Sequence, residues 1–460
     1  MWMKKRIWSF FCSFFLITII TGQVVMASEP IPYRTVEDDT DTAVFAPAED
    51  ISLYATSAAL IDADSGRVLY GKNADTPMAM ASTTKVMTCI RVLENCALDE
   101  VLTVSSYAAS MPQVKLYIKK GEEYTVRDLL YSLMLESHND SAVALAEHVG
   151  RKFLSEELQN KPVSEYTTQE SRQAVAAFAT LMNAKAAELG CVDTWYITPN
   201  GLDATEELTL EDGSVIQKEH CTTATELARI MAYCISESPR KDLFLEITRT
   251  ANHSFYANGR SFSCANHNAF LTMMDGALSG KTGFTNKAGY CYVGALESEG
   301  RTFVVALLAC GWPNNKNYKW SDTRELMQYG MDYFFYRSFK EEGVAFDESR
   351  LKPILVSDGQ TERLGGTAYT NVAVAESGVS GEGQQPDREQ ILLRTDEQIQ
   401  VTCTVEDHLT APVEGGTQVG TIEYSVNGIV YKKDAIVTTD AIDKIDLRWC
   451  VMQVFERFIL

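Results

Sequence analysis

The chain has 460 residues, 45% of them hydrophobic, which is enough to bury the cores of two domains. It carries 62 acidic against 41 basic residues, a formal net charge of −21. An acidic chain with no basic cluster interleaved with aromatic residues excludes a nucleic acid as its partner.

The N-terminus has the parts of a secretory signal peptide. Residues 4–6 are basic and residues 7–20 form an apolar run. The small residue Ala27 then provides a suitable cleavage site for signal peptidase. We predict a signal peptide over residues 1–27 and an exported protein. The alternative, a retained membrane anchor, is disfavoured because the apolar run is short for a bilayer span. Residues 28–50 are acidic without periodicity and predict a disordered linker.

The first of three short motifs, Ser82 to Lys85, lies at the start of a predicted helix. Val86, Ile90 and Leu93 follow at helical spacing. Side chains three residues apart share a helix face, so Lys85 can reach the Ser82 hydroxyl. Alone the pattern is uninformative, because the chain contains two other Ser-x-x-Lys strings and an N-cap serine before a surface lysine is the ordinary explanation.

The second motif, Ser137-His138-Asn139, lies between two helical runs. Thr125 can cap the first run, and the second extends over residues 142–154. A short loop between packed helices is a rigid place to present polar groups. The alternative is ordinary loop capping by Ser137 and Asn139.

The third motif, Lys281-Thr282-Gly283, opens a predicted strand. The stretches 290–296 and 302–308 that follow predict antiparallel strands of a buried sheet. A lysine and a threonine on such a strand can face a carboxylate, and Gly283 allows close approach to the backbone. The alternative is an edge-strand lysine that prevents aggregation.

In this order the motifs supply a nucleophile, a base, a proton relay and a cationic edge. An acyl-transfer enzyme that lacks a His/Asp pair needs those parts. The six histidines show no ligand spacing, which disfavours a metal-dependent peptidase, and no metal or cofactor is predicted. Most of the cysteines lie in apolar runs and are predicted to be buried free thiols, among them Cys89, Cys234, Cys291 and Cys310.

The C-terminal part changes character. Residues 321–339 predict a long amphipathic helix that closes a first domain over residues 51–340. Short alternating strands predict a small all-β domain over residues 341–442, with a mobile loop at 376–389.

Residues 443–460 form a further unit, an amphipathic helix. It is too short and too charged to span a bilayer, and an interfacial position on a membrane surface is favoured. The alternative is a helix docked on its own domain. Its apolar stripe consists of Leu447, Val451, Val454, Phe455 and Phe458.

The chain resembles the serine D-Ala-D-Ala carboxypeptidases, the low-molecular-mass penicillin-binding proteins of peptidase family S11. Their signature is the same trio of motifs, and the resemblance covers residues 51–340 with a weaker echo toward the C-terminus. It implies an α+β fold of the β-lactamase/transpeptidase type, a mostly antiparallel sheet flanked by helices with a helical subdomain, followed by a small all-β domain. The matching strings are residues 81–88, 139–147, 199–202, 220–224 and 275–290.

The resemblance also implies catalytic roles. Ser82 attacks the terminal D-Ala-D-Ala bond and forms an acyl-enzyme. Lys85, unprotonated, takes the proton of the Ser82 hydroxyl, and Ser137 passes a proton to the leaving amine.

Substrate binding is implied for the remaining motif residues. Asn139 binds the substrate amide, and Lys281 and Thr282 hold the terminal carboxylate. Gly283 has no side chain, so the substrate can approach the backbone of the strand. The backbone N–H groups of Ser82 and Phe284 form the oxyanion hole.

Two departures from the family pattern stand out. His138 lies where this branch often has glycine, and residues 155–173 are polar and irregular, which suggests a local elaboration. Neither departure removes a catalytic group.

The implied function is an exported carboxypeptidase that trims the terminal D-Ala from peptidoglycan stem peptides and binds β-lactams covalently. It is expected outside the cytoplasm, at the outer face of the membrane or in the cell wall. The alternatives are a β-lactamase of the same fold, a broader esterase, and a penicillin-binding sensor without turnover. Whether the substrate is a stem peptide or a crosslink stays open.

Overall fold

The computed structural model describes residues 51–209, 213–341, 343–375 and 389–459. The predicted signal peptide and acidic linker lie outside these residues, as does 376–388 of the predicted loop. The chain divides into a large unit, Asp41–Gly343 with Arg388–Gln398, and a small unit that contains Val344–Asp387 and Ile399–Leu460.

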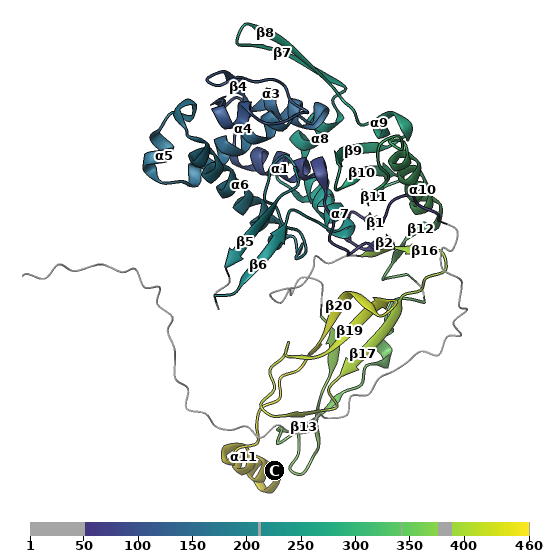
Figure 1. Cartoon of the computed structure of the whole chain (residues 1–460). Coiled ribbons are helices and arrows are strands. Elements are labelled where there is room, and N and C mark those ends of the chain that lie inside the picture. The colour runs from purple at the N-terminus through teal and green to yellow at the C-terminus, as the bar shows by residue number, and fades with distance from the viewer. Residues whose placement is uncertain (1–50, 210–212, 342, 376–388, 460) are drawn as a thin grey trace, which may run out of the picture. The chain divides into compact units, whose positions relative to one another are not determined.

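The large unit is built on a five-stranded antiparallel sheet in the order β2-β1-β11-β10-β9 (Figure 1). Glu299 and Gly300, both with positive φ, make the tight turn between β10 and β11. The two strands predicted after the third motif are therefore confirmed. The sheet strands are β1 (Ser57–Asp62), β2 (Val68–Lys72), β9 (Ala277–Thr285), β10 (Gly289–Ser298) and β11 (Arg301–Leu308).

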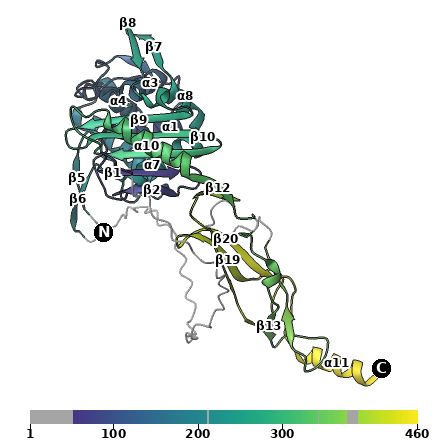
Figure 2. The same cartoon turned by 90° about the vertical axis from the view of Figure 1, so that its right-hand side faces the viewer.

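Helices cover both faces of this sheet. Successive side chains of a strand point to opposite faces, and in the buried strands both sets are apolar and need to be covered. Ala59 and Ile61 of β1 lie in one core cluster with α1 (Lys85–Asn95) and α7 (Ala224–Ala232). Leu60, which points to the other face, packs with Leu326 and Met327 of α10 (Tyr318–Tyr333). Figure 2 shows α10 lying across this face.

A helical subdomain continues the first cluster. Thr125 caps α3 by accepting from the Asp128 N–H, as the sequence predicts. Gly150 lets α4 approach α6, since a Cβ there would lie 1.9 Å from the Ala174 carbonyl oxygen. The other helices of the large unit are α2 (Ser106–Ala109), α3 (Val126–Tyr131), α4 (Asn139–Gly150), α5 (Glu156–Asn160), α6 (Thr168–Glu188), α8 (Lys241–Arg249) and α9 (Phe270–Met273), of which α8 and α9 contact β9.

Four two-stranded ribbons complete the large unit, and each is antiparallel. They pair β3 (Val101–Thr103) with β4 (Glu123–Thr125), β5 (Thr205–Thr209) with β6 (Val215–Glu219), β7 (Asn252–Ala257) with β8 (Arg260–Ala265), and β12 (Phe334–Ser338) with β16 (Gln390–Arg394).

Two local predictions are wrong. The helix expected over residues 321–339 ends at Tyr333, because Phe334–Ser338 pairs with β16 instead. Residues 155–173 are not irregular: they contain α5 and the first turns of α6, which a capping box between Thr167 and Glu170 starts.

The small unit is all β apart from one short 3₁₀ turn and its C-terminal helix, within the residues described. Alternate side chains of β19 are buried, and Asn427-Gly428, with positive φ, turns β19 into β20. One sheet has the order β14-β13-β18 and the other β15-β20-β19-β17. The elements are β13 (Ile354–Ser357), β14 (Ala368–Thr370), β15 (Val372–Val374), β17 (Gln400–Val405), β18 (His408–Thr410), β19 (Gln418–Val426), β20 (Ile429–Thr438) and α11 (Leu447–Ile459).

The ten cysteines that the structure describes are all free thiols, and eight of them are buried. The prediction of buried free thiols is confirmed for Cys89, Cys234, Cys291 and Cys310, none of which is exposed to solvent. Burial raises the pKa of each of these four thiols.

Glu147, buried in α4, makes the stability of the large unit depend on pH. Burial raises its carboxyl pKa from 4.5 to about 7, although Ser105 Oγ donates to Oε1 at 2.8 Å. A raised folded-state pKa stabilises the fold fully below pH 4.5, and this contribution disappears as pH rises through about 7.

We therefore expect Glu147→Gln to leave stability nearly unchanged at pH 4.5 and to raise it at pH 8.5 by about 1–3 kcal/mol. Thermal unfolding at both pH values measures the difference from the parent chain. Glu157→Gln, at an exposed site on α5, is the matched control. Equal effects of Glu147→Gln at the two pH values would contradict the prediction.

Candidate active site

Ser82 lies in a tight 3₁₀ turn, Ala81–Thr84, directly ahead of α1. Two glycines bring other backbone segments against this turn. A Cβ on Gly201 would lie 1.9 Å from the Ala81 carbonyl oxygen, and a Cβ on Gly283 would lie 2.8 Å from the Ser82 amide nitrogen. The backbone of β9 at Gly283 therefore lies so close to the Ser82 amide that no side chain fits between them.

Lys85 is the first residue of α1, and its side chain is fully buried. Its Nζ lies 2.7 Å from Ser82 Oγ, 3.0 Å from Asn139 Oδ1 and 2.6 Å from the Asn200 carbonyl oxygen. A neutral amine has two N–H donors and one lone pair. Because the Asn139 and Asn200 oxygens can only accept, they take both donors, and the lone pair is left for the Ser82 hydroxyl.

The charge state of Lys85 follows from its surroundings. Burial holds the pKa of Lys85 well below its usual range, and the positive charge of Lys281 lowers it further against the opposing effect of Asp140. Burial also lowers the pKa of Lys281 to about 7. A lowered pKa favours the free amine, the form that a general base requires.

Ser137 and Lys281 form a second pair. Ser137 connects a π-helical turn, Ser132–Glu136, to α4 and has a left-handed backbone with φ 64°. Lys281 donates to Ser137 Oγ at 2.9 Å and to the Thr282 carbonyl oxygen at 2.8 Å. Lys281-Thr282-Gly283 lies in the middle of β9, which begins at Ala277, so the expectation that the motif opens the strand is wrong.

Asn139 is the first residue of α4 rather than a loop residue, which corrects the sequence expectation. Its Oδ1 accepts from Lys85, and its Nδ2 donates to the carbonyl oxygens of Pro112 at 3.3 Å and Gln113 at 3.1 Å. Both ends of the amide are engaged. Any contact of this amide with a substrate has to share these hydrogen bonds.

Strand β9 places the other predicted residues on either side of Gly283. It is the last strand of its sheet. Thr282 precedes Gly283, and Phe284, which is 37% exposed, follows it with its ring 4.7 Å from that of Tyr290. The structure thus joins Ser82, Lys85 and Asn139 directly, pairs Ser137 with Lys281, and packs Gly283 on Ser82.

His138 does not distort the second motif. Its φ of −66° and ψ of 128° suit any residue, and the left-handed position is Ser137. The His138 ring uses Nδ1 to contact Ser132 Oγ at 2.8 Å. Replacing glycine by histidine at this position therefore leaves the loop intact.

Two contributors to the site are missing from the predicted residues. The Asn200 carbonyl accepts from Lys85, and His220 Nε2 lies 2.8 Å from Thr84 Oγ1. Burial and the charge of Lys85 lower the pKa of His220 to about 3, so the imidazole is neutral. The strings at 199–202 and 220–224 indicated these regions. The hydrogen bond from Lys85 to the Asn200 backbone carbonyl could not be predicted, because every residue type has this group.

One group of potential metal ligands lies elsewhere in the described residues. The ligand atoms of Cys96, Glu100 and His148 lie within 4.8 Å of one another. The ammonium of Lys152 lies 3.0 Å from Glu100 Oε2 and 3.4 Å from Cys96 Sγ. Lys152 is thus a cation already bound within this cluster.

A serine whose hydroxyl faces the lone pair of a buried lysine, on a sheet covered by helices, defines a serine acyl-transfer enzyme of the penicillin-binding type. The D-alanyl-D-alanine carboxypeptidase family matches residues 42–154 and 172–309. The chain belongs to this family of serine peptidases, S11. A second match, to the C-terminal domain of penicillin-binding protein 5, covers residues 394–444.

Individual relatives agree. The chain is 24% identical over 396 residues to the D-alanyl-D-alanine carboxypeptidase DacF of Bacillus subtilis. The aligned region covers 85% of this chain and 86% of the relative. It is 31% identical over 248 residues to DacB2 of Mycobacterium tuberculosis, 54% of this chain and 72% of the relative. The crystal structure of DacD from Francisella tularensis shares the fold, with a TM-score of 0.60 at 18% identity over 88% of this chain and 98% of that one.

The family match omits residues 155–171. This gap lies within the segment 155–173 that the sequence marks as a local elaboration, and it contains α5. The elaboration is therefore helical, and it leaves the three motifs in place.

Gly283→Ala should disable the site without unfolding the sheet. The new Cβ would meet the Ser82 and Thr83 amide nitrogens at 2.8 and 3.0 Å, so β9 has to move away from Ser82. A displacement of about 1 Å costs roughly 10²-fold in rate. Release of D-alanine from a peptide ending in D-Ala-D-Ala measures the loss.

Gly71→Ala in β2 is the matched control, because the nearest contact of its Cβ is the Ala74 side chain at 3.2 Å. We expect it to keep the parent rate. Full activity of Gly283→Ala would show that the close approach of β9 to Ser82 is not needed.

Proposed function

We propose that the chain removes the terminal D-alanine from peptidoglycan stem peptides through an acyl-enzyme on Ser82. The arrangement of acceptors around Lys85 is the observation that carries the proposal. In the neutral form of Lys85 the oxygens of Asn139 and Asn200 accept from its two N–H groups, so its lone pair accepts from Ser82 at 2.7 Å. Membership of the carboxypeptidase family supports the same substrate class.

In the proposed reaction Ser82 Oγ attacks the carbonyl carbon of the D-Ala-D-Ala bond while Lys85 Nζ takes the hydroxyl proton. The negative oxygen that develops is stabilised by the backbone N–H groups of Ser82 and Phe284. Ser137 delivers a proton to the leaving nitrogen, and free D-alanine departs. Water then hydrolyses the ester and restores the Ser82 hydroxyl.

Lys281 and Thr282 hold the terminal carboxylate of the substrate in this proposal. Because the pKa of Lys281 is about 7, the empty site is only partly protonated there at neutral pH. A bound carboxylate favours the protonated amine and raises this pKa. The added charge also disfavours protonation of Lys85, so substrate binding and activation of the base support each other.

The decisive measurement is the intact mass of the chain after it is mixed with benzylpenicillin. We expect a one-to-one adduct on the Ser82 peptide that decays slowly, and none with Ser82→Ala. Lys85→Ala should slow adduct formation by about 10²–10⁴-fold, the usual contribution of a general base.

The other outcomes separate the alternatives. A fleeting adduct with rapid drug hydrolysis would identify a β-lactamase, and labelling of Ser82→Ala would overturn the assignment of the nucleophile. A stable adduct without release of D-alanine from a pentapeptide would favour a sensor. Cleavage of a crosslinked dimer rather than a pentapeptide would make the enzyme an endopeptidase.

We propose further that the protein is exported by the segment 1–27 and held on a membrane surface by α11. Among the residues described, no helix has the length and apolar character to cross a bilayer. Helix α11 instead exposes apolar side chains, which favours an interfacial position. They are Leu447 (81%), Val451 (44%), Met452 (52%), Val454 (45%) and Phe455 (58%).

Vesicle co-sedimentation of the chain lacking residues 1–27 tests this position. Helix α11 holds Arg448, Glu456 and Arg457, so its attraction to anionic lipid is weak, and we expect similar binding to phosphatidylcholine and phosphatidylglycerol vesicles. Val451→Glu with Phe455→Glu should abolish binding, whereas Gln453→Glu at a half-buried position should not. Equal binding of all variants would refute the role of α11.

A further inference from the structure

The amide of Asn139 depends on an irregular segment, residues 112–118, which we call the support loop. Its Pro112 and Gln113 carbonyls accept from Asn139 Nδ2, and the Val114 carbonyl accepts from the Asn139 N–H at 2.7 Å. Because these acceptors fix Nδ2, they leave Oδ1 facing Lys85. The orientation of an amide that touches the base is therefore decided by loop carbonyls.

Asp140, the next residue in α4, holds the other half of the support loop. Its carboxylate is fully buried. Oδ1 accepts from the Leu116 N–H at 2.9 Å, and Oδ2 accepts from the N–H groups of Tyr117 at 2.8 Å and Ile118 at 3.2 Å. Three successive backbone donors converge on one carboxylate, and the left-handed Tyr117, with φ 64°, shapes this concave turn.

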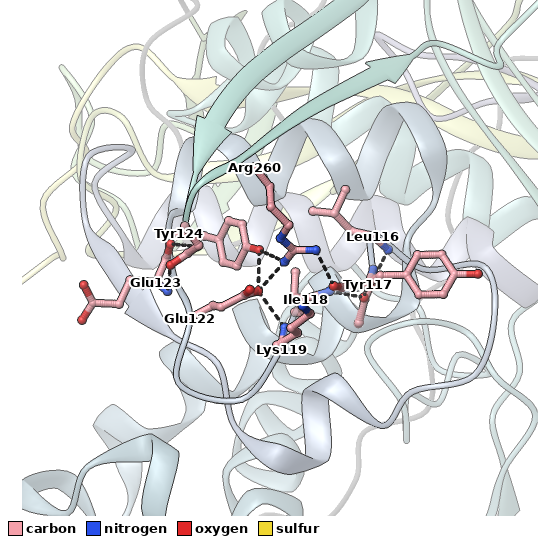
Figure 3. A network of polar contacts seen from close by, with 10 residues as sticks. Leu116, Tyr117, Ile118, Lys119, Glu122, Glu123, Tyr124 and Arg260 are labelled. Atoms are coloured by element: carbon pink, nitrogen blue, oxygen red, sulfur yellow. Dashed lines mark hydrogen bonds and ion pairs between the residues drawn. The ribbon is translucent and has the colours of Figure 1, made fainter.

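A second support reaches the loop from the tip of the β7–β8 ribbon. Arg260 donates through one guanidinium nitrogen to the Tyr117 carbonyl at 3.1 Å and through the other to Glu122 Oε2 at 2.5 Å and Tyr124 Oη at 3.0 Å. Figure 3 shows the guanidinium between Tyr124, Glu122 and the Tyr117 backbone. Glu122 also accepts from the Lys119 N–H at 2.8 Å, so the residue that directly follows the support loop is held by the same carboxylate.

We propose that Asp140 is a positioning residue for the reaction: it fixes the support loop, and through the loop carbonyls it holds the Asn139 amide against Lys85. Arg260 is a weaker, outer support of the same loop. The proposal rests on the acyl-transfer function assigned to Ser82 and Lys85. It gives the aspartate after the second motif a task that is separate from substrate contact.

Asp140 also acts on Lys85 through its charge. Its negative charge raises the pKa of Lys85, against burial and Lys281. The other titratable groups that face Lys85 are His138 and His220, and burial lowers the pKa of both, which keeps them uncharged at neutral pH. Burial is the main cause of the lowered pKa of Lys85, and Lys281 and Asp140 are the charged neighbours that modify it in opposite directions.

Asp140→Asn is the test, since it keeps the shape but replaces an acceptor by a donor that opposes the loop N–H groups. The rate constant for acylation by benzylpenicillin should fall by about 10²-fold, because Asn139 loses its orientation. The acid limb of the pH profile should move to lower pH, because loss of a negative charge lowers the pKa of Lys85 further. The final one-to-one adduct should be unchanged.

Ser141→Ala is the matched control. Ser141 is the next residue of α4, equally buried, and its Oγ lies 2.7 Å from Ser132 Oγ rather than on the loop. We expect Ser141→Ala to keep the parent rate constant and acid limb. If Asp140 had a purely structural role, Asp140→Asn would reduce the fraction of active protein but leave the rate constant and the acid limb equal to those of Ser141→Ala. That result would overturn the proposal.

Arg260→Met separates the two contributions and keeps the test decisive if Asp140→Asn does not fold. The Arg260 side chain is 30% exposed, so its loss is tolerable. We expect a fall in the acylation rate of about 3–10-fold, because one outer support is lost, with no shift of the acid limb. Unchanged acylation in Arg260→Met and Asp140→Asn would refute the proposal, whereas an unreactive parent chain would refute the function itself.

Discussion

The site depends on one buried amine whose hydrogen-bonding capacity is fully used. Lys85 has no contact with solvent, and its three neighbours are a hydroxyl and two oxygens that only accept. Burying a charged ammonium is costly, so the neutral form is favoured, and the neutral form has a single lone pair to offer. In the mechanism that we propose, activation of Ser82 follows from burial of Lys85 and from the geometry of the acceptors around it, without a histidine.

The remaining architecture serves this arrangement. The turn that holds Ser82 is enclosed by β9 and by the segment at Gly201, and both approaches are closer than a side chain would allow. Helix α4 contributes Asn139 and Asp140 in succession, one toward the amine and one toward the support loop. Residues of the sheet and of the helical subdomain share one core cluster, and Lys85 Nζ lies among groups from both parts, so small shifts of either part act on this amine.

Much of this could be read from the sequence because side-chain pattern determines it. Nearly continuous apolar runs predicted β10 and β11, and the spacing of Ser82 and Lys85 predicted their contact. The errors lie where partners distant in sequence decide. Phe334–Ser338 continues the predicted helical pattern but pairs with β16, which is distant in the sequence. The predicted second helix begins at residue 142, whereas α4 begins at Asn139. The Asn200 carbonyl could not be predicted, since every residue carries one.

The buried free thiols Cys89, Cys291 and Cys403 have a consequence for how this chain can be studied. Only a thiolate reacts with alkylating reagents or oxidants, and burial both shields these sulfurs and raises their pKa. Their modification therefore has to wait for an opening of the surrounding structure. Cys89 in α1, Cys291 in β10 and Cys403 in β17 are buried native reporters in three different elements, so the order in which they are alkylated would reveal which parts of the molecule open first.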